Sequence, residues 1–310
     1  MERHRIGIIG LGKVAIEQHL PAIQENAAFE LIAVSSANGD TWRGDAQAFA
    51  DYRDMLLMPE LDVVAICTPP SARHEIARAA LIAGKDTLLE KPPTATLAEL
   101  AALEREADRS KKVLFLSWHS QHNDAVEIAR RTLAGETLQG LRVTWKEDVG
   151  FWHPGQKWIW EQGGFGVLDM GINAFSILTR ILPAPLFVRQ AELQYLSDAQ
   201  TPIAASIAFG SHQLSGDLRA EFDWRSANRQ IWEIELRTEQ GATVTLREGG
   251  RRLEIDGRVI IDGPSREYAG VYTHFASLLR ERRSEVDWEP FRIVADVFMV
   301  GRRTVLPATP

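Results

Sequence analysis

A glycine-rich turn directly after an apolar run near the start of the chain limits the fold more than any other feature. Residues 6–10 read as a strand, and Gly10-Leu11-Gly12-Lys13-Val14-Ala15 follows as a G-x-G-x-x-A form of the dinucleotide-binding fingerprint. In this fingerprint the first glycine turns the chain, the second admits a pyrophosphate to the backbone, and the small third residue packs helix on strand. The alternative, a simple tight turn, is disfavoured because the motif ends a predicted strand and begins a predicted helix.

The first 120 residues alternate short β-branched runs with helical stretches. Strands are predicted at residues 6–10, 29–35, 63–68, 87–90 and 113–117, and Thr96 with Glu99 forms a capping box that begins a helix. Strands that alternate with helices imply a parallel, doubly wound sheet. We therefore predict a Rossmann NAD(P)-binding domain at residues 1–120.

The end of the second strand should carry the residue that reads the adenosine ribose. The sequence there is Ser36-Ala37-Asn38, with neither the acid that favours NAD nor the arginine that favours NADP. Both cofactors therefore stay open. The predicted cofactor contacts are Gly10, Gly12, Lys13, Val14, Ser36, Ala37, Thr68, Pro69, Glu90 and Lys91.

Two proline-containing segments follow predicted strands, Thr68-Pro69-Pro70 and Glu90-Lys91-Pro92. Prolines after a strand often only end it. A lysine between a strand end and two prolines is instead held rigidly at the carboxyl edge of the sheet, where ligands bind in such folds. Lys91 is therefore a candidate catalytic residue.

The pattern changes near residue 120. A helix at 122–133 precedes predicted strands at 141–149, 188–196, 203–209, 214–224, 230–237, 243–247 and 253–255, and closing helices are predicted at 268–282 and 291–306. Polar residues alternate with apolar ones in several of these strands, so one face of the sheet meets water. We predict an α+β substrate-binding and oligomerisation domain at 121–310, built on a large open, mainly antiparallel sheet with the closing helices packing back.

A glycine-rich stretch at 163–171 leads into a predicted helix that carries Asp169 and Asn173. Positions i and i+4 share a helix face, so both side chains can address one small molecule. The alternative is that Asp169 caps the helix and Asn173 faces solvent. The sequence of this stretch alone does not decide between them.

The motifs Gly10-Leu11-Gly12, Thr68-Pro69-Pro70 and Glu90-Lys91-Pro92 resemble those of the Gfo/Idh/MocA family, named for glucose-fructose oxidoreductase and inositol dehydrogenase. The resemblance continues through residues 145–148, 152–161, 164–173 and 221–225, where it is closest to bacterial aldose 1-dehydrogenases acting on L-arabinose and D-galactose. It implies a nicotinamide-dependent enzyme in which Lys91 and Asp169 flank the reacting carbon. It also implies an open sheet through which members often form homodimers.

Many members of this family place a histidine four residues after the acid and use it as the proton acceptor. This chain has Asn173 at that position, as the arabinose and galactose branch does. An amide cannot accept a proton at neutral pH. The resemblance therefore leaves Asp169 or Lys91 as the base, with Asn173 orienting the reacting oxygen.

Aromatic and polar residues of the second half suit a sugar, which presents apolar C–H faces and a ring of hydroxyls. The chain has 9 tryptophans, and many of them could equally serve the core. The predicted substrate contacts, chosen mainly from the resemblance, are His119, Glu147, Trp152, His153, Asp169, Asn173 and Trp232. His119, Glu147 and His153 lack the spacing of a zinc site, so no metal is expected.

We therefore expect an aldose 1-dehydrogenase that uses NAD or NADP and oxidises a pyranose such as L-arabinose, D-galactose or D-fucose at C1 to the aldono-lactone. The alternatives are an inositol or other sugar or polyol dehydrogenase of the same family, and a non-catalytic NAD(P)- or sugar-binding regulator. The net charge of −7 and the mixed charges argue against nucleic acid or membrane partners. The single cysteine, Cys67, fits a cytoplasmic protein.

Overall fold

The computed structural model describes residues 3–36, 42–226 and 230–307. Its chain forms two compact units, the first made of Met1–His119 with Tyr268–Asp287 and the second of Ser120–Glu267 with Trp288–Pro310. Residues 268–287 belong to the first unit, so the closing helix predicted at 268–282 is part of the nucleotide-binding unit rather than of the second domain.

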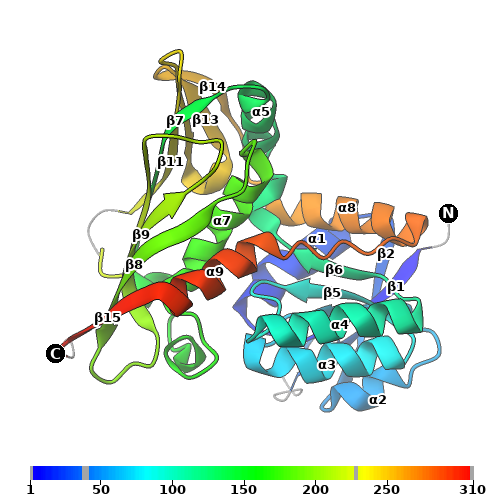
Figure 1. Cartoon of the computed structure of the whole chain (residues 1–310). Helices are drawn as coiled ribbons and strands as arrows, with labels where there is room; N and C mark the ends of the chain where they lie inside the picture. Colours follow the sequence, from blue (N-terminus) through cyan, green and yellow to red (C-terminus); the bar gives the residue numbers. More distant parts are fainter. Residues whose placement is uncertain (1–2, 37–41, 227–229, 308–310) are drawn as a thin grey trace. The chain divides into compact units, whose positions relative to one another are not determined.

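The first unit is built on a six-stranded parallel sheet (Figure 1). Its strand order is β3-β2-β1-β4-β5-β6, the order of a doubly wound dinucleotide-binding fold. The strands are β1 (His4–Ile9), β2 (Phe29–Ser35), β3 (Gln47–Phe49), β4 (Val63–Ile66), β5 (Asp86–Glu90) and β6 (Leu114–Ser117). The predicted Rossmann fold is confirmed, while the three-residue edge strand β3 was not predicted.

Helices cover both faces of this sheet. The helices are η1 (Ala15–His19), α1 (Leu20–Glu25), α2 (Tyr52–Leu56), α3 (Pro70–Ile82), α4 (Leu97–Ser110) and α8 (Glu267–Glu281). Apolar residues of α1 and α8 share one core with β1, β4 and β6, while α3 and α4 pack together and α3 packs on β5 (Figure 1). The predicted capping box of α4 is present, with Thr96 accepting from the Glu99 amide and Glu99 accepting from that of Thr96.

The second unit is built on a nine-stranded sheet in the order β14-β13-β12-β11-β7-β10-β9-β8-β15. Neighbours are antiparallel except β7 with β10 and β8 with β15, which are parallel. The strands are β7 (Leu138–Lys146), β8 (Phe187–Leu196), β9 (Pro202–Gly210), β10 (Asp217–Asp223), β11 (Ile231–Thr238), β12 (Thr243–Arg247), β13 (Arg252–Ile255), β14 (Arg258–Asp262) and β15 (Gly301–Leu306). The prediction of a mainly antiparallel sheet is confirmed.

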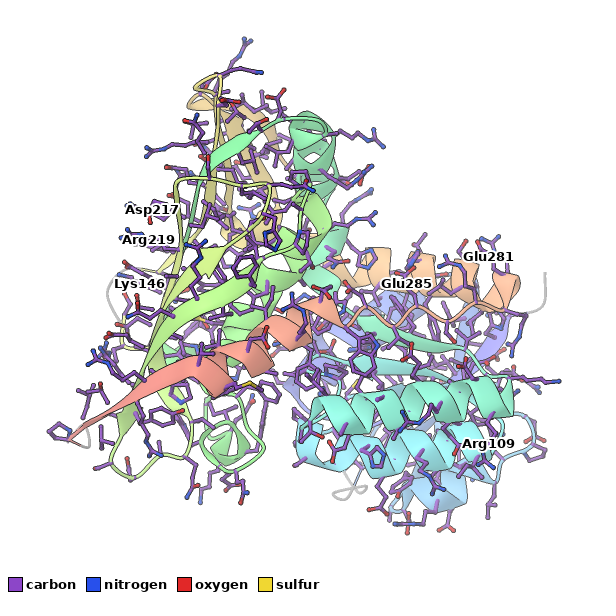
Figure 2. The ribbon with its side chains drawn as sticks, viewed as in Figure 1. Arg109, Lys146, Asp217, Arg219, Glu281 and Glu285 are labelled. Carbon is purple, nitrogen blue, oxygen red and sulfur yellow. The ribbon has the colours of Figure 1, made fainter. Side chains whose placement is uncertain are left out.

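The two faces of this sheet differ as the polar alternation predicted. Lys146, Asp217 and Arg219 lie on the outer face (Figure 2), where Asp217 pairs with Arg219 and Lys146 with Glu221. Phe222 lies on the opposite, buried face and contacts Phe175 of α7 edge to face. The predicted position of the Asp169 helix, α7 (Leu168–Ile181), on the inner face of the sheet is therefore confirmed.

The remaining helices of this unit are α5 (Asp124–Leu133), α6 (Val149–Trp152), η4 (Lys157–Trp160), η5 (Glu248–Gly250) and α9 (Glu289–Val300), while η3 (His119–His122) begins with the last residue of the first unit's N-terminal segment. The prediction of one helix across 291–306 is wrong, because α9 ends at Val300 and Gly301 has extended backbone angles. A side chain at Gly301 would lie 2.6 Å from the Val297 carbonyl oxygen, and the residues after it pair with β8. No helix in the described ranges is long and apolar enough to span a bilayer.

Candidate functional site

The fingerprint turn has the geometry that a pyrophosphate requires. Gly10 has a φ of +95°, and a Cβ there would lie 2.9 Å from both the amide nitrogen and Cγ2 of Thr68. Its amide donates to the Ser35 carbonyl at 2.8 Å, which joins the turn to the end of β2. A Cβ on Gly12 would meet no atom within 4 Å. Gly10 is therefore required by the fold, whereas Gly12 leaves open space for a ligand.

The helix that follows begins as a π-helix, η1, which the sequence did not reveal. Val14 is its N-cap residue, and Ala15 is fully buried, as the small third residue of the fingerprint should be. Lys13 is exposed. These features fit a dinucleotide phosphate at the start of the helix, with Gly12 and its neighbours supplying backbone amides.

Two other predicted cofactor segments border this turn. Thr68 contacts Gly10, and its Oγ1 is buried with no hydrogen-bond partner among the described residues, while Pro69 is exposed. The Ser36 amide donates to Phe49 of β3. Ala37 lies outside the described residues, so the structure does not address its predicted contact.

Glu90, at the end of β5, is buried rather than presented to a ligand. One carboxylate oxygen accepts from the Tyr268 hydroxyl at 2.8 Å and from Ser117 at 3.1 Å, and the other accepts from the Lys91 amide at 2.8 Å. Burial opposes ionisation, but His19, His119 and Arg73 more than offset it and lower the pKa of Glu90 below its usual range. Glu90 is therefore an anion.

Lys91 itself is half-buried and precedes a cis peptide bond to Pro92. Its backbone is held from both sides, since Arg73 donates to the carbonyl groups of Glu90 and Pro92. His119, a predicted sugar contact, also lies in this unit, with its ring stacked on Tyr268 at 5.1 Å between centroids. The structure thus groups His119 with Glu90.

In the second unit, α7 holds Asp169 and Asn173 one turn apart. The two residues are only 3% and 9% exposed, and the N-cap of α7 is Val167. The alternative of a capping aspartate with a solvent-facing asparagine is therefore wrong. His153 Nε2 lies 3.9 Å from the Asp169 carboxylate, so the structure brings together two of the predicted substrate residues.

The turn before α7 is tightly packed against its surroundings. A Cβ on Gly164 would collide with the Trp158 carbonyl and lie 2.8 Å from that of Ile159. Gly166 has a φ of +53°, and a Cβ there would lie 2.9 Å from the Pro202 nitrogen. These glycines let the backbone approach η4 and β9 closely, which positions the first turn of α7.

Glu147 holds together a cluster of indole rings in the second unit. Its carboxylate accepts from Trp145 Nε1 at 2.7 Å and from Trp224 Nε1 at 3.2 Å. Trp224 also contacts the rings of His153 and Trp160, and Trp145 meets Trp232 edge to face. Glu147 and Trp224 are buried, so this cluster orders the aromatic residues around His153.

Two of the tryptophans predicted to contact substrate differ in environment. Trp232 Nε1 is buried and has no hydrogen-bond partner among the described residues, so it is a spare donor beside the Glu147 cluster. Trp152 is 43% exposed and donates to Gln230 at 3.1 Å. The sequence did not predict three residues of the site. Trp145 and Trp224, which donate to Glu147, are revealed only by their neighbours in the folded sheet. His19, which lies beside Glu90, was also not predicted.

The described residues contain no group of three or more histidine, cysteine, aspartate or glutamate side chains that could hold a metal ion.

Comparison with known proteins agrees with this geometry. Residues 4–117 match the model of the oxidoreductase family with an NAD-binding Rossmann fold, GFO_IDH_MocA. Over 309 residues, 99% of each chain, the sequence is 44% identical to galactose 1-dehydrogenase of Pseudomonas fluorescens. The chain belongs to the Gfo/Idh/MocA family of oxidoreductases.

Solved structures extend the likeness to the whole fold. D-galactose-1-dehydrogenase from Rhizobium etli is 44% identical and superposes with a TM-score of 0.94, covering 100% of this chain and 99% of that one. A 3-ketoreductase from Actinomadura kijaniata, solved with TDP-benzene and NADP, is 19% identical with a TM-score of 0.85 over 99% of this chain and 100% of that one. The second likeness shows the shared fold alone. The family assignment and the nicotinamide-binding fold predicted from sequence are confirmed.

Proposed function

We propose that this protein is an NAD(P)-dependent aldose 1-dehydrogenase that oxidises C1 of D-galactose and of pyranoses with the same ring stereochemistry. The observation that carries the proposal is the full-length identity of 44% to galactose 1-dehydrogenase. The buried Asp169–Asn173 pair and the spare Trp232 donor are consistent with a hydroxyl-rich substrate.

The reaction needs a hydride acceptor and a proton acceptor. A nicotinamide cofactor held at the Gly10-Leu11-Gly12 turn would supply the hydride acceptor. We assign the second to Asp169, because a positioned base contributes about 10²- to 10⁴-fold and Asn173 cannot act as one. His153 Nε2 lies 3.9 Å from the Asp169 carboxylate, so its ring is part of the surroundings of the proposed base.

Lys91 and Asn173 complete the proposed roles. The Lys91 ammonium group stabilises negative charge that develops on the C1 oxygen in the transition state. The Asn173 amide orients that oxygen. If Lys91 were the base instead, its removal would abolish the fall in rate at low pH, because a base must lose its proton before it can act, whereas removal of Asp169 would leave this acid limb in place.

The test is a reduced-nicotinamide absorbance assay with D-galactose, L-arabinose, D-fucose and myo-inositol, each with NAD and NADP, followed by trapping of the lactone as a hydroxamate. We expect lactone from the three aldoses, with kcat/KM values within roughly 10- to 200-fold of one another because they differ by single substituents. Oxidation of inositol alone would favour a polyol dehydrogenase, and no turnover with any pair would favour a regulator.

A matched pair of variants tests the assignment of the base. Asp169→Asn should lower kcat by about 10²-fold or more, while Asp124→Asn, on the exposed first turn of α5, should leave kcat unchanged. An Asp169→Asn enzyme with an undiminished rate and the same pH profile would refute the role of Asp169.

We also propose that the charged outer face of the nine-stranded sheet is a homodimer interface. Its rows of opposite charges, such as Arg219 with Asp217 and Lys146 with Glu221, can pair equally well with a second copy. Sedimentation at increasing salt should show a dimer that weakens as ionic strength rises. A monomer at low salt would contradict this part of the proposal.

A further inference from the structure

Both ring nitrogens of His19 are engaged in the core of the first unit. Nδ1 lies 2.7 Å from the Tyr272 hydroxyl and Nε2 lies 3.3 Å from the Glu90 carboxylate. His19 is fully buried and Glu90 is 2% exposed. Burial lowers the pKa of His19, but Cys67, Tyr272 and Glu90 together raise it well above its usual value. The Glu90 carboxylate beside Nε2 favours the charged form of the ring, which can donate from both nitrogens.

These contacts join three segments that are far apart in the sequence. His19 ends η1, the helix that starts at the fingerprint turn, and the Gly12 carbonyl accepts from Ile16 in this helix. Glu90 ends β5, and Tyr272 lies on α8. Single π-turns in helices often occur at functional sites. The imidazole thus links the dinucleotide turn to the residue before Lys91.

The orientation of the Glu90 carboxylate follows from its donors. His19, Ser117 and Tyr268 all address one oxygen, Oε1. With that oxygen held, the second oxygen points at the Lys91 amide, 2.8 Å away. The other groups that face this carboxylate are His119 from the start of η3 and Arg73 from α3, both of which favour its charged form.

We propose that His19 and Glu90 are positioning residues, a buried ion pair that fixes the backbone of Lys91 relative to the dinucleotide-binding turn. The proposal rests on the role of Lys91 in the proposed function. In this proposal Glu90 does not make the direct cofactor contact that the sequence predicted, because its carboxylate is buried and bonded to Tyr268, Ser117 and the Lys91 amide. Because reacting groups must be placed within fractions of an ångström, a misplacement of about 1 Å can cost on the order of 10²-fold in rate.

A double-mutant cycle tests whether His19 acts through Lys91. His19→Gln keeps a neutral donor toward Glu90 but removes the charge, and we expect kcat to fall roughly 10- to 100-fold with little change in the sugar KM. In a Lys91→Met background the same substitution should change kcat by less than about 2-fold, since the group being positioned is gone. Ser117→Ala removes another hydrogen bond to the same oxygen of Glu90 but keeps the charge of His19 and its link to η1, so we expect a smaller fall in kcat than with His19→Gln. An equal loss from His19→Gln in both backgrounds overturns the proposal.

A second measurement needs neither cofactor nor turnover. Reductive methylation with ¹³C-formaldehyde labels each lysine, and the NMR signal of Lys91 is assigned by its loss in Lys91→Arg. We expect His19→Gln and the conservative Glu90→Gln to move this signal and its titration while Lys112, on the opposite end of the sheet, stays unchanged. A Lys91 signal identical to that of the native protein refutes the proposal. If the native chain oxidises no sugar, the proposed function fails while this measurement still decides the positioning role.

Discussion

Replacing Glu147 tests how the indole cluster is held together. Its carboxylate accepts from the buried Trp224 and the half-buried Trp145. Hydrogen bonds to charged groups contribute about 1.5–3 kcal/mol each, and an unsatisfied buried donor costs about 1–3 kcal/mol. Trp145 can recover water, so Glu147→Ala should cost roughly 2–4 kcal/mol, mostly at Trp224. Glu147→Gln keeps one acceptor oxygen and should cost about half as much.

Thermal unfolding followed by tryptophan fluorescence measures this loss. For a unit of this size about 1 kcal/mol corresponds to 2–4 °C, so Glu147→Ala should lower the Tm of the second unit by roughly 5–15 °C. Glu221→Ala is the control: its surface pair with Lys146 is about half exposed at the glutamate and contributes at most about 1 kcal/mol. If Glu147→Ala melts within 1 °C of the native protein, or no lower than Glu221→Ala, the carboxylate does not organise the cluster.

Three further outcomes are expected. Gly12→Ala should leave Tm unchanged or slightly higher, because its Cβ meets no atom within 4 Å. The same substitution should weaken NAD(P) binding roughly tenfold or more by calorimetry. Unaltered binding would contradict a pyrophosphate at this turn. Gly164→Ala should lower the free energy of unfolding by about 1–3 kcal/mol in chemical denaturation, and should reduce kcat because it displaces α7. Gly263→Ala, with open space around it, should match the native protein in both measurements. Because the pKa of His19 is raised on folding, the stabilising effect of this residue is complete below pH 6.5 and is lost as pH rises through the raised value. The native protein should therefore lose free energy of unfolding with rising pH in this range. In His19→Gln the free energy of unfolding should depend less on pH.

The nucleotide-binding unit could be predicted closely because its signals are local. A strand, a G-x-G-x-x-A turn and a helix are adjacent in the sequence, and the period of each strand shows which residues are buried. The predicted strands at 29–35 and 87–90 nearly coincide with β2 and β5. The short strand β3 carries no such signal, since only three residues pair and only with the edge of β2.

The second unit was predicted in class but less closely at its edges. The alternation of polar and apolar residues in β10 and β11 predicts strands with one solvent-exposed face, and both strands are present. β15 was read as helix because its apolar residues continue the pattern of α9. Pairing with β8, far away in the sequence, decides its conformation, as tertiary contacts often override local propensity.

The candidate site shows the same division between local and long-range information. The sequence by itself determined the fingerprint turn, Lys91 and the Asp169–Asn173 spacing, because each depends on neighbours within a few residues. Only the tertiary structure decided that Asp169 and Asn173 are buried and that Trp145 and Trp224 share Glu147. It alone decided that Glu90 is held by His19 and Tyr268, which are 71 and 178 residues away from it. The burial of a charge and the choice of its partners depend on which distant segments pack together, and no local pattern records that choice.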